Sequence, residues 1–251
     1  MPILTYIIHS FIICFFIYLS ALPIILWTKK PHILDIFWGI GIATASTSLI
    51  KMYATPNSSS YLIIGFVILW AIRLSSFLLY TRVLTPHNDR RYESIIGNSL
   101  LKMVFKQCII QALLQTLIVI TLFPLTQTKS FSPLSLMIGC SIFLIGLLFE
   151  SIADFQLYQF KKNNQGLCNV GLWKYSRHPN YFFECLLWFG ISIVFIPSTQ
   201  FFISLIGPIS IFIIVYFITG PLTERASQQK YGIDFKNYSK KTAYFLIWFN
   251  K

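Results

Sequence analysis

The stretch ILTYIIHSFIICFFIYLSALPIILW, residues 3–27, contains no charged residue and is followed by Lys29 and Lys30. A transmembrane helix needs about 20 mostly apolar residues, so this stretch is long enough to cross a bilayer. No basic segment precedes it and no small-residue cleavage site follows it. We therefore interpret it as a retained membrane helix and not as a signal peptide.

The composition of the whole chain indicates a membrane protein. Of the 251 residues, 55% are hydrophobic and only 11% are charged, whereas soluble globular proteins carry roughly 25% charged residues. This excludes an ordinary soluble domain, a disordered chain and a disulfide-rich scaffold. The net charge of +12 would suggest nucleic acid as the partner of a soluble protein. Here we interpret it through membrane topology and expect no nucleic-acid partner.

The rest of the chain contains several more apolar segments. They cover residues 35–54, 60–82, 103–124, 133–157 and 182–219. The last segment is too long for one span and breaks at Pro197, which predicts a hairpin of two helices. The sequence thus predicts an all-α, polytopic bundle of about seven transmembrane helices. We expect a single membrane-embedded domain over residues 1–251, with a cytoplasmic or interfacial tail over 220–251.

The basic residues predict the orientation of this bundle. With seven spans, all but three of the 20 Lys and Arg residues fall on one face; Lys51 and Lys129 fall on the other, and Arg73 lies inside a span. Cytoplasmic loops carry the excess of Lys and Arg. We therefore expect the N-terminus outside and the C-terminus in the cytoplasm, in the cytoplasmic membrane if the protein is bacterial. The acidic residues fall on the same face, where they either cap helices and pair with cations or line a polar cavity.

The densest polar segment is VGLWKYSRHPNYFFE, residues 170–184. Pro179 disfavours a helical conformation at His178 and suits the first turn of the helix that follows. A helix N-terminus beside Arg177 favours an anion, and Glu184, one turn into the helix, would face the same cavity. The alternative is a basic membrane flank with interfacial aromatic residues, which explains Arg177 but leaves His178 and Glu184 unexplained.

A second segment places carboxylates at membrane depth. In FESIADFQLYQFKK, residues 149–162, Glu150, Asp154 and Lys161 share one helical face. Arg73 is a charge inside an apolar span and needs a partner, which either carboxylate or a bound anion would supply. A purely structural salt bridge is the alternative.

The sequence gives no sign of a metal or redox site. The five cysteines are odd in number, and no pair has the spacing of metal ligands or of a redox motif. No zinc-protease, P-loop or dinucleotide-fold motif is present. We therefore expect no metal.

Taken together, these segments resemble the membrane reductases of the steroid 5-alpha-reductase type, in particular their bacterial steroid-reductase-like branch. The resemblance is carried, in order, by DIFWG (35–39), WAIRL (70–74), Asp89-Arg90-Arg91-Tyr92, FExxxDxQ (149–156), GLWKYSRHPNYFFE (171–184), and Tyr231-Gly232 with Tyr238 and Thr242. Its Arg-His-Pro-x-Tyr core is shared with the isoprenylcysteine carboxyl methyltransferases, whose helical fold is similar.

The resemblance implies a cofactor and a reaction. Reductases of this type hold NADPH in the cytoplasmic half of a seven-helix bundle. They reduce a carbon–carbon double bond conjugated to a carbonyl, in a lipid- or steroid-like substrate that enters from the bilayer. By this resemblance the cofactor would be bound by Arg73, Glu150, Asp154, Lys161, Arg177, His178, Asn180, Tyr181, Glu184, Tyr231 and Tyr238.

The resemblance also suggests catalytic residues. Glu184 would hydrogen-bond the nicotinamide amide. Asp35, which opens the second span, would stand in for the glutamate with which the family polarises the substrate ketone; a carboxylate favoured by the helix dipole is the alternative. The chain has Trp70 where the family has a polarising tyrosine. The proton donor is therefore open among Tyr53, Tyr80 and Tyr92, of which we take Tyr92 as the catalytic candidate.

Two other functions stay open. The first is an S-adenosylmethionine-dependent methyltransferase of the isoprenylcysteine carboxyl methyltransferase type, acting on a membrane-embedded acceptor. The second is a non-catalytic protein that binds lipid or takes part in membrane assembly. Binding of NADPH, of S-adenosylmethionine or of neither nucleotide would discriminate among the three.

Overall fold

The computed structural model describes residues 2–28, 30–55, 57–84, 100–164 and 166–246, and these are helical with no strand. A single isolated β-bridge joins Ser176 and Ala243 within them. The chain divides into two compact units. The first unit comprises residues 1–131 and 198–206, and the second comprises 132–197 and 207–251.

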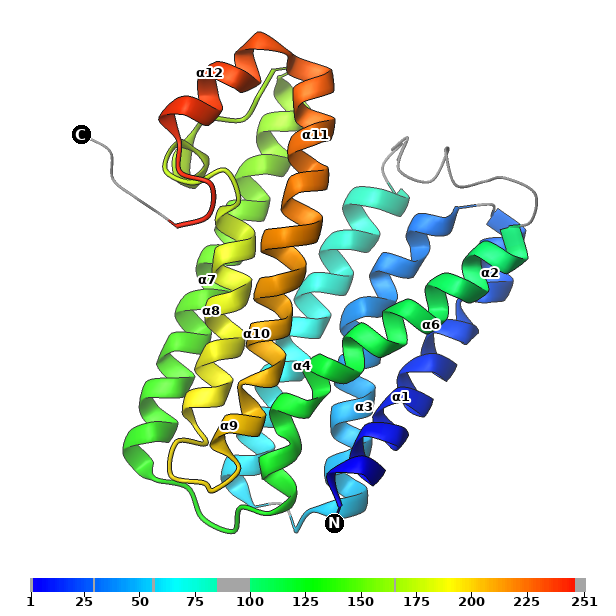
Figure 1. The fold of residues 1–251 in the computed structure, drawn as a ribbon, viewed down its shortest axis with the longest axis vertical. Coiled ribbons are helices and arrows are strands. Elements are labelled where there is room, and N and C mark those ends of the chain that lie inside the picture. Colours follow the sequence, from blue (N-terminus) through cyan, green and yellow to red (C-terminus); the bar gives the residue numbers. More distant parts are fainter. Residues whose placement is uncertain (1, 29, 56, 85–99, 165, 247–251) are drawn as a thin grey trace. The chain divides into compact units, whose positions relative to one another are not determined.

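The first unit is built around the central helix α3 (Phe37–Tyr53), which contacts three long neighbours (Figure 1). These are α1 (Ile3–Ser20), α4 (Ser58–Leu78) and α6 (Leu100–Val119). The unit also contains α2 (Leu22–Thr28), α9 (Phe201–Ser204) and two 3-10 segments, η1 (Pro31–Ile36) and η3 (Ile120–Thr126).

A buried glutamine joins α6 to α3 and α1. Gln115 is fully buried, and its Nε2 donates hydrogen bonds to the carbonyl oxygen of Trp38 at 2.6 Å and to the hydroxyl of Tyr18 at 3.3 Å. Such a polar side chain is costly in hydrocarbon unless its donors are satisfied, so it holds helices together. Gly41 provides the space, because a Cβ there would lie 2.3 Å from Gln115 Oε1.

The second unit consists of two closely packed helices followed by a long C-terminal helical run. The pair is α7 (Pro133–Asn163) and α8 (Pro179–Ile193). The run comprises α10 (Ile206–Ile213), the π-helical segment η5 (Ile214–Thr219), α11 (Gly220–Tyr231) and α12 (Ile233–Lys241). Small residues let the pair approach closely: a Cβ on Gly190 would lie 2.7 Å from the amide nitrogen of Phe143 and 2.8 Å from the carbonyl oxygen of Gly139.

Six helical segments of the described chain are long and apolar enough to cross a membrane, which indicates a multi-pass membrane protein. They are Ile3–Thr28, His32–Tyr53, Ser58–Leu84, Val104–Thr126, Pro133–Asn163 and Phe201–Tyr231. The break predicted at Pro197 is confirmed, because α8 ends at Ile193 and α9 begins at Phe201. With 15 residues, α8 is shorter than a typical span of about 20. The count of seven spans and the orientation of the termini therefore stay predictions.

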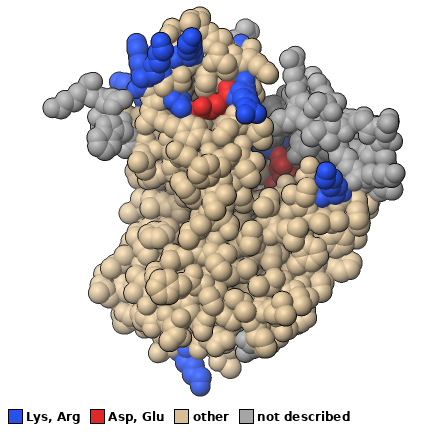
Figure 2. Space-filling model, viewed as in Figure 1, with Lys and Arg blue, Asp and Glu red and all other residues tan. Residues whose placement is uncertain are grey.

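Charge in the second unit is confined to one end. No charged residue occurs in 132–149 or 185–223, whereas 150–184 and 224–241 contain many. Figure 2 shows blue and red atoms gathered over the α11–α12 end, above a tan surface. The 31 residues of α7 extend for about 46 Å at 1.5 Å per residue, which exceeds the hydrocarbon thickness of about 30 Å. The charged end of α7 can therefore reach beyond the hydrocarbon.

Candidate functional site

The start of α8 carries the densest group of predicted site residues. His178 precedes the helix with non-helical backbone angles (φ −139°, ψ 56°), and Pro179 occupies the first turn. This confirms the predicted boundary, because proline disfavours a helical conformation at the residue before it and needs no hydrogen-bond partner for its own nitrogen.

The segment that leads into α8 is held against α7 by two hydrogen bonds. One of them is to Gln156, the last residue of the FExxxDxQ motif. The Leu172 amide donates to Gln156 Oε1 at 2.9 Å, and the Trp173 indole Nε1–H donates to the Ala153 carbonyl at 2.9 Å. Gly171 has φ +57°, and a Cβ there would lie 2.4 Å from Gln156 Oε1. Only glycine fits both this backbone conformation and this approach, so Gln156 has a structural role in holding the loop.

Asp154 of α7 and Asn180 of α8 form the polar centre of the site. Asn180 Nδ2 donates to Asp154 Oδ1 at 3.0 Å, and Asp154 is only 8% exposed. The other polar atom of the amide, Asn180 Oδ1, is buried and has no hydrogen-bond partner in the described part of the chain. A buried carbonyl oxygen without a donor is uncommon, and it is available to a ligand that carries an N–H or O–H group.

Two further carboxylates extend this centre along both helices. Glu150 lies one turn before Asp154 on α7 and is 2% exposed. Glu184 lies one turn after Asn180 on the same face of α8 and is half-buried. The expectation that the carboxylates Glu150 and Asp154 share one buried face is confirmed, whereas Lys161, at the end of α7, is exposed.

His178 packs between aromatic side chains. The side chain is 4% exposed and stacks on Tyr181 with ring centroids 5.3 Å apart, while Tyr244 packs edge-on at 5.1 Å. Its Nε2 lies 3.5 Å from Glu224 Oε1. The predicted His178 and Tyr181 are thus brought together, with a carboxylate from α11 beside them.

Arg177 is engaged by the protein itself. Its Nε donates to Glu224 Oε1 at 2.5 Å, and its Nη1 donates to the carbonyls of Ser239 at 2.7 Å and Thr242 at 3.0 Å. The guanidinium also lies 5.3 Å from the ring centroid of Tyr244. Arginine offers five donors in a planar fork, and this network uses it to bind the C-terminal segment. Arg177 therefore has a structural role at these donors, and the expectation that it also faces a bound anion stays a prediction.

Residues 238–246, here called the C-terminal strap, cover the loop before α8. The Tyr238 hydroxyl donates to the Trp173 carbonyl at 2.5 Å, and Ser176 Oγ donates to the Phe245 carbonyl at 2.9 Å. Burial raises the pKa of Tyr238 above its ordinary value, so the hydroxyl keeps its proton at neutral pH. Phe245 of the strap is buried in the second unit, against the rings of Phe182 and Phe212.

Sequence reasoning missed Glu224 and Tyr244 as parts of this site. Glu224 is the only acidic residue between Glu184 and Asp234, and this isolated charge after a long apolar run was the available signal. Tyr244 gave no signal, because its position over Arg177 depends on the path of the strap.

The remaining predicted residues are distributed over both units. Tyr231 is half-buried at the end of α11, where Lys230 lies 5.1 Å from its ring centroid. In the first unit, Arg73 is half-buried on α4, with its guanidinium 5.8 Å from the ring centroid of Phe77.

Asp35 and two of the three tyrosines proposed as proton donors lie among the described residues, each with different surroundings. Asp35 forms an ion pair with Arg82. Tyr53 is hydrogen-bonded to His9 at the other end of α3, far from Asp35, and Tyr80 is half-exposed. The catalytic candidate Tyr92, with Asp89, Arg90 and Arg91, lies outside the described residues. Within the described residues, no group of three His, Cys, Asp or Glu side chains could hold a metal ion.

Comparison with known proteins identifies the family. Residues 21–242 match the family DUF1295, described as a protein of unknown function, so the chain belongs to this family. The family is related to steroid 5-alpha-reductase-like membrane proteins. No curated protein and no solved structure matches the chain.

Proposed function

We propose that the protein is an NADPH-dependent membrane reductase that acts on a carbon–carbon double bond conjugated to a carbonyl, in a lipid- or steroid-like substrate. The observation that carries the proposal is the Asp154–Asn180 pair, in which the buried Oδ1 of Asn180 has no hydrogen-bond partner among the described residues, one turn before Glu184 on α8. The family relationship supports the same class of reaction.

The acceptors of this site fit the carboxamide of a nicotinamide. A carboxamide presents two N–H donors, and Asn180 Oδ1 and Glu184 are acceptors on one face of α8. Asp154 fixes the amide of Asn180 so that its carbonyl oxygen, and not its NH2 group, is left for the ligand. When bound, NADPH would supply the hydride that is added to the double bond.

The phosphates of a dinucleotide need cations, and the same end of the unit provides them. Lys161 and Lys162 are exposed in the last turn of α7, just before the chain enters the loop that leads to α8. Arg177 contributes indirectly, because it holds the strap that covers this loop. These residues bind and orient the cofactor at the charged end, while the apolar part of the unit excludes water.

The membrane supplies the substrate. The apolar segments of the protein are surrounded by lipid, so a hydrophobic small molecule can reach the site from the bilayer without crossing water. The excess of basic residues supports a cytoplasmic position for the charged end of the second unit, where soluble NADPH would be available. Asp35 and Tyr92 are the proposed groups for carbonyl polarisation and protonation.

The proposal is tested with the full chain purified in detergent. We expect NADPH to raise the melting temperature and to change its own fluorescence on binding, and Asn180→Ala to weaken both effects. Asn169→Ala is the matched control, because it removes an exposed amide from the loop before α8. Binding of S-adenosylmethionine in place of NADPH would favour the methyltransferase, and absence of any nucleotide effect would favour a non-catalytic protein.

The methyltransferase is retained as the second candidate because of one observation. His178 and Tyr181, two of the three residues of the shared Arg-His-Pro-x-Tyr core that were expected at the cofactor, stack with ring centroids 5.3 Å apart. The Asn180–Asp154 pair belongs to the reductase-like segments and favours the reductase.

A further inference from the structure

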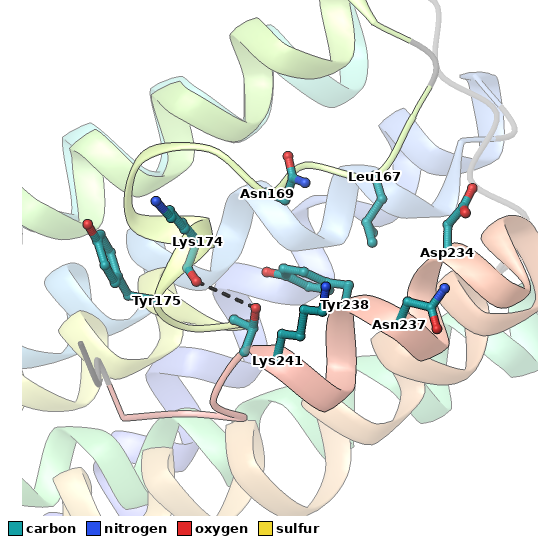
Figure 3. Close-up of a pocket in the computed structure, with 9 residues that line it drawn as sticks. Leu167, Asn169, Lys174, Tyr175, Asp234, Asn237, Tyr238 and Lys241 are labelled. Atoms are coloured by element: carbon teal, nitrogen blue, oxygen red, sulfur yellow. Dashed lines mark hydrogen bonds between the residues drawn. The ribbon is translucent and has the colours of Figure 1, made fainter. Parts of the chain in front are cut away.

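A polar cavity occurs in the second unit, outside the Asp154–Asn180 centre. It measures about 620 Å³ and lies between the loop before α8 and helix α12. Figure 3 shows Asn169 and Lys174 on the loop side and Asp234, Asn237 and Lys241 on α12.

Two hydrogen bonds hold the walls of this cavity together. The Tyr238 hydroxyl of α12 donates to the Trp173 carbonyl of the loop at 2.5 Å. Thr242 Oγ1 donates to the Lys174 carbonyl at 3.5 Å, which is the dashed line in Figure 3. The cavity is thus formed before any ligand arrives, and binding does not require the loop and α12 to be ordered.

Four of the nine lining side chains carry nitrogen donors. Lys174 and Lys241 carry positive charge, and Asn169 and Asn237 each offer an amide NH2 group. Asp234 is the only carboxylate among the lining residues, and it lies at the opposite end of the cavity from Lys174 in Figure 3. This distribution attracts an anionic group toward the lysines and leaves one carboxylate as an acceptor for a donor on the same ligand.

We infer that this cavity binds a small, water-soluble, phosphate-bearing molecule. Lys174 and Lys241 contact the phosphate, and Asp234 accepts a hydrogen bond from a hydroxyl or amine group of the ligand. Lysine is a common phosphate ligand, and it acts there as a point charge.

The position of the cavity favours a soluble ligand over a lipid headgroup. Helix α11 has 12 residues, most of them polar, between the last apolar segment and α12. That length corresponds to about 18 Å, whereas the headgroup region adds only about 5–8 Å on each side of the hydrocarbon. The polar composition of α11 favours an opening on the aqueous side of the lipid phosphates.

The cavity is also distinct from the proposed cofactor site. Of the residues assigned to NADPH by family resemblance, only Tyr238 lines it, and the proton of its hydroxyl is already donated to Trp173. The inference does not depend on the reductase proposal.

The test measures binding of inorganic pyrophosphate to the full chain in detergent, by calorimetry. We expect saturable binding that weakens as sodium chloride is added, because salt screens exposed charges. Lys174→Gln and Lys241→Gln should each lower the affinity by about threefold to tenfold, as for the loss of one screened charge. Lys240→Gln is the matched control: Lys240 is exposed in the same last turn of α12 but does not line the cavity.

Four outcomes would overturn the inference. These are absence of pyrophosphate binding, unchanged affinity in the Lys174→Gln/Lys241→Gln double variant, an equal loss in Lys240→Gln, and displacement of pyrophosphate by NADPH. Binding to vesicles that contain phosphatidic acid, without binding to pyrophosphate, would also count against it by identifying a lipid as the ligand. Because both lysines are exposed, the variants should melt as the wild type does, which separates loss of binding from loss of folding.

Discussion

Arg177, in the loop before α8, and Glu224, on α11, form an ion pair in which Nε lies 2.5 Å from Oε1. The side chains are 14% and 22% exposed, so the pair is largely removed from water. It connects the start of α8 to α11, and the same guanidinium binds the carbonyls of Ser239 and Thr242. A single arginine thereby links three segments that are distant in the sequence.

Replacing Glu224 should destabilise the second unit. Glu224→Ala leaves Arg177 largely buried without its anionic partner, and we expect a loss of about 2–3 kcal/mol of unfolding free energy, near the lower limit for breaking a buried pair. Thermal melting of the full chain measures this. The control is Arg225→Gln, an exposed neighbour on α11, which should melt close to the wild type; equal melting of both variants would show that the ion pair contributes nothing.

Asn180→Asp should weaken NADPH binding in a pH-dependent manner. The substitution places a second carboxylate about 3 Å from Asp154, and two such groups cannot both be ionised at low cost. We expect weak binding at pH 8 and partial recovery near pH 5, because one of the two carboxyl groups then takes up a proton. NADPH titrations at both pH values test this, with wild type as the reference for the general effect of pH. Binding equal to wild type at pH 8 would remove Asn180 from the site.

Close packing of α7 and α8 should be sensitive at Gly190. A Cβ there would meet backbone atoms of Phe143 and Gly139 at 2.7–2.8 Å, and backbone cannot move aside as a side-chain end can. We expect Gly190→Ala to cost about 2–3 kcal/mol, as overpacking commonly does. Gly65→Ala is the contrasting control, because nothing lies within 4 Å of a Cβ at that helical position. That variant should be neutral or slightly stabilising, since alanine favours helix over glycine.

Tyr238 should contribute to the alkaline pH dependence of stability. Burial raises its pKa in the folded protein above the ordinary value of about 10. Above pH 10 the unfolded chain therefore loses this proton while the folded chain retains it, and the free energy of unfolding falls as the pH rises. Tyr238→Phe should be less stable at pH 7, because the hydrogen bond to the Trp173 carbonyl is lost. Its stability should also fall less steeply from pH 10 to 11. Chemical unfolding at these pH values tests both statements, and equal slopes would contradict the second.

Much of the architecture could be predicted from the sequence because transmembrane helices are a local property. Each apolar segment of sufficient length satisfies its own backbone hydrogen bonds as a helix, whatever surrounds it. The segment 133–157 was thus predicted as a span and lies within α7, and Pro197 marked the break after α8. The boundary at Pro179 was also local, because it depends on the steric effect of one residue on its neighbour.

The partners of the polar residues could not be predicted in the same way. The position of Arg177 at a helix N-terminus gave no indication of the carbonyls that it binds, which come from residues more than sixty positions away. Such long-range hydrogen bonds depend on which distant segments pack together in the fold. Neither the hydropathy nor the spacing of residues indicates this.

The sequence by itself therefore determined a multi-pass helical membrane protein, the concentration of charge at one end of its second unit, and the residues that bring it into the DUF1295 family. Only the tertiary structure decided that Asn180 is fixed by Asp154 with one acceptor left open, that Arg177 holds the C-terminal strap, and that α12 forms one wall of a polar cavity. The physical reason is the distance along the chain over which each interaction acts. Hydrophobicity acts along a continuous segment and can be recognised in order, whereas directional hydrogen bonds depend on atoms that come together only after the chain has folded.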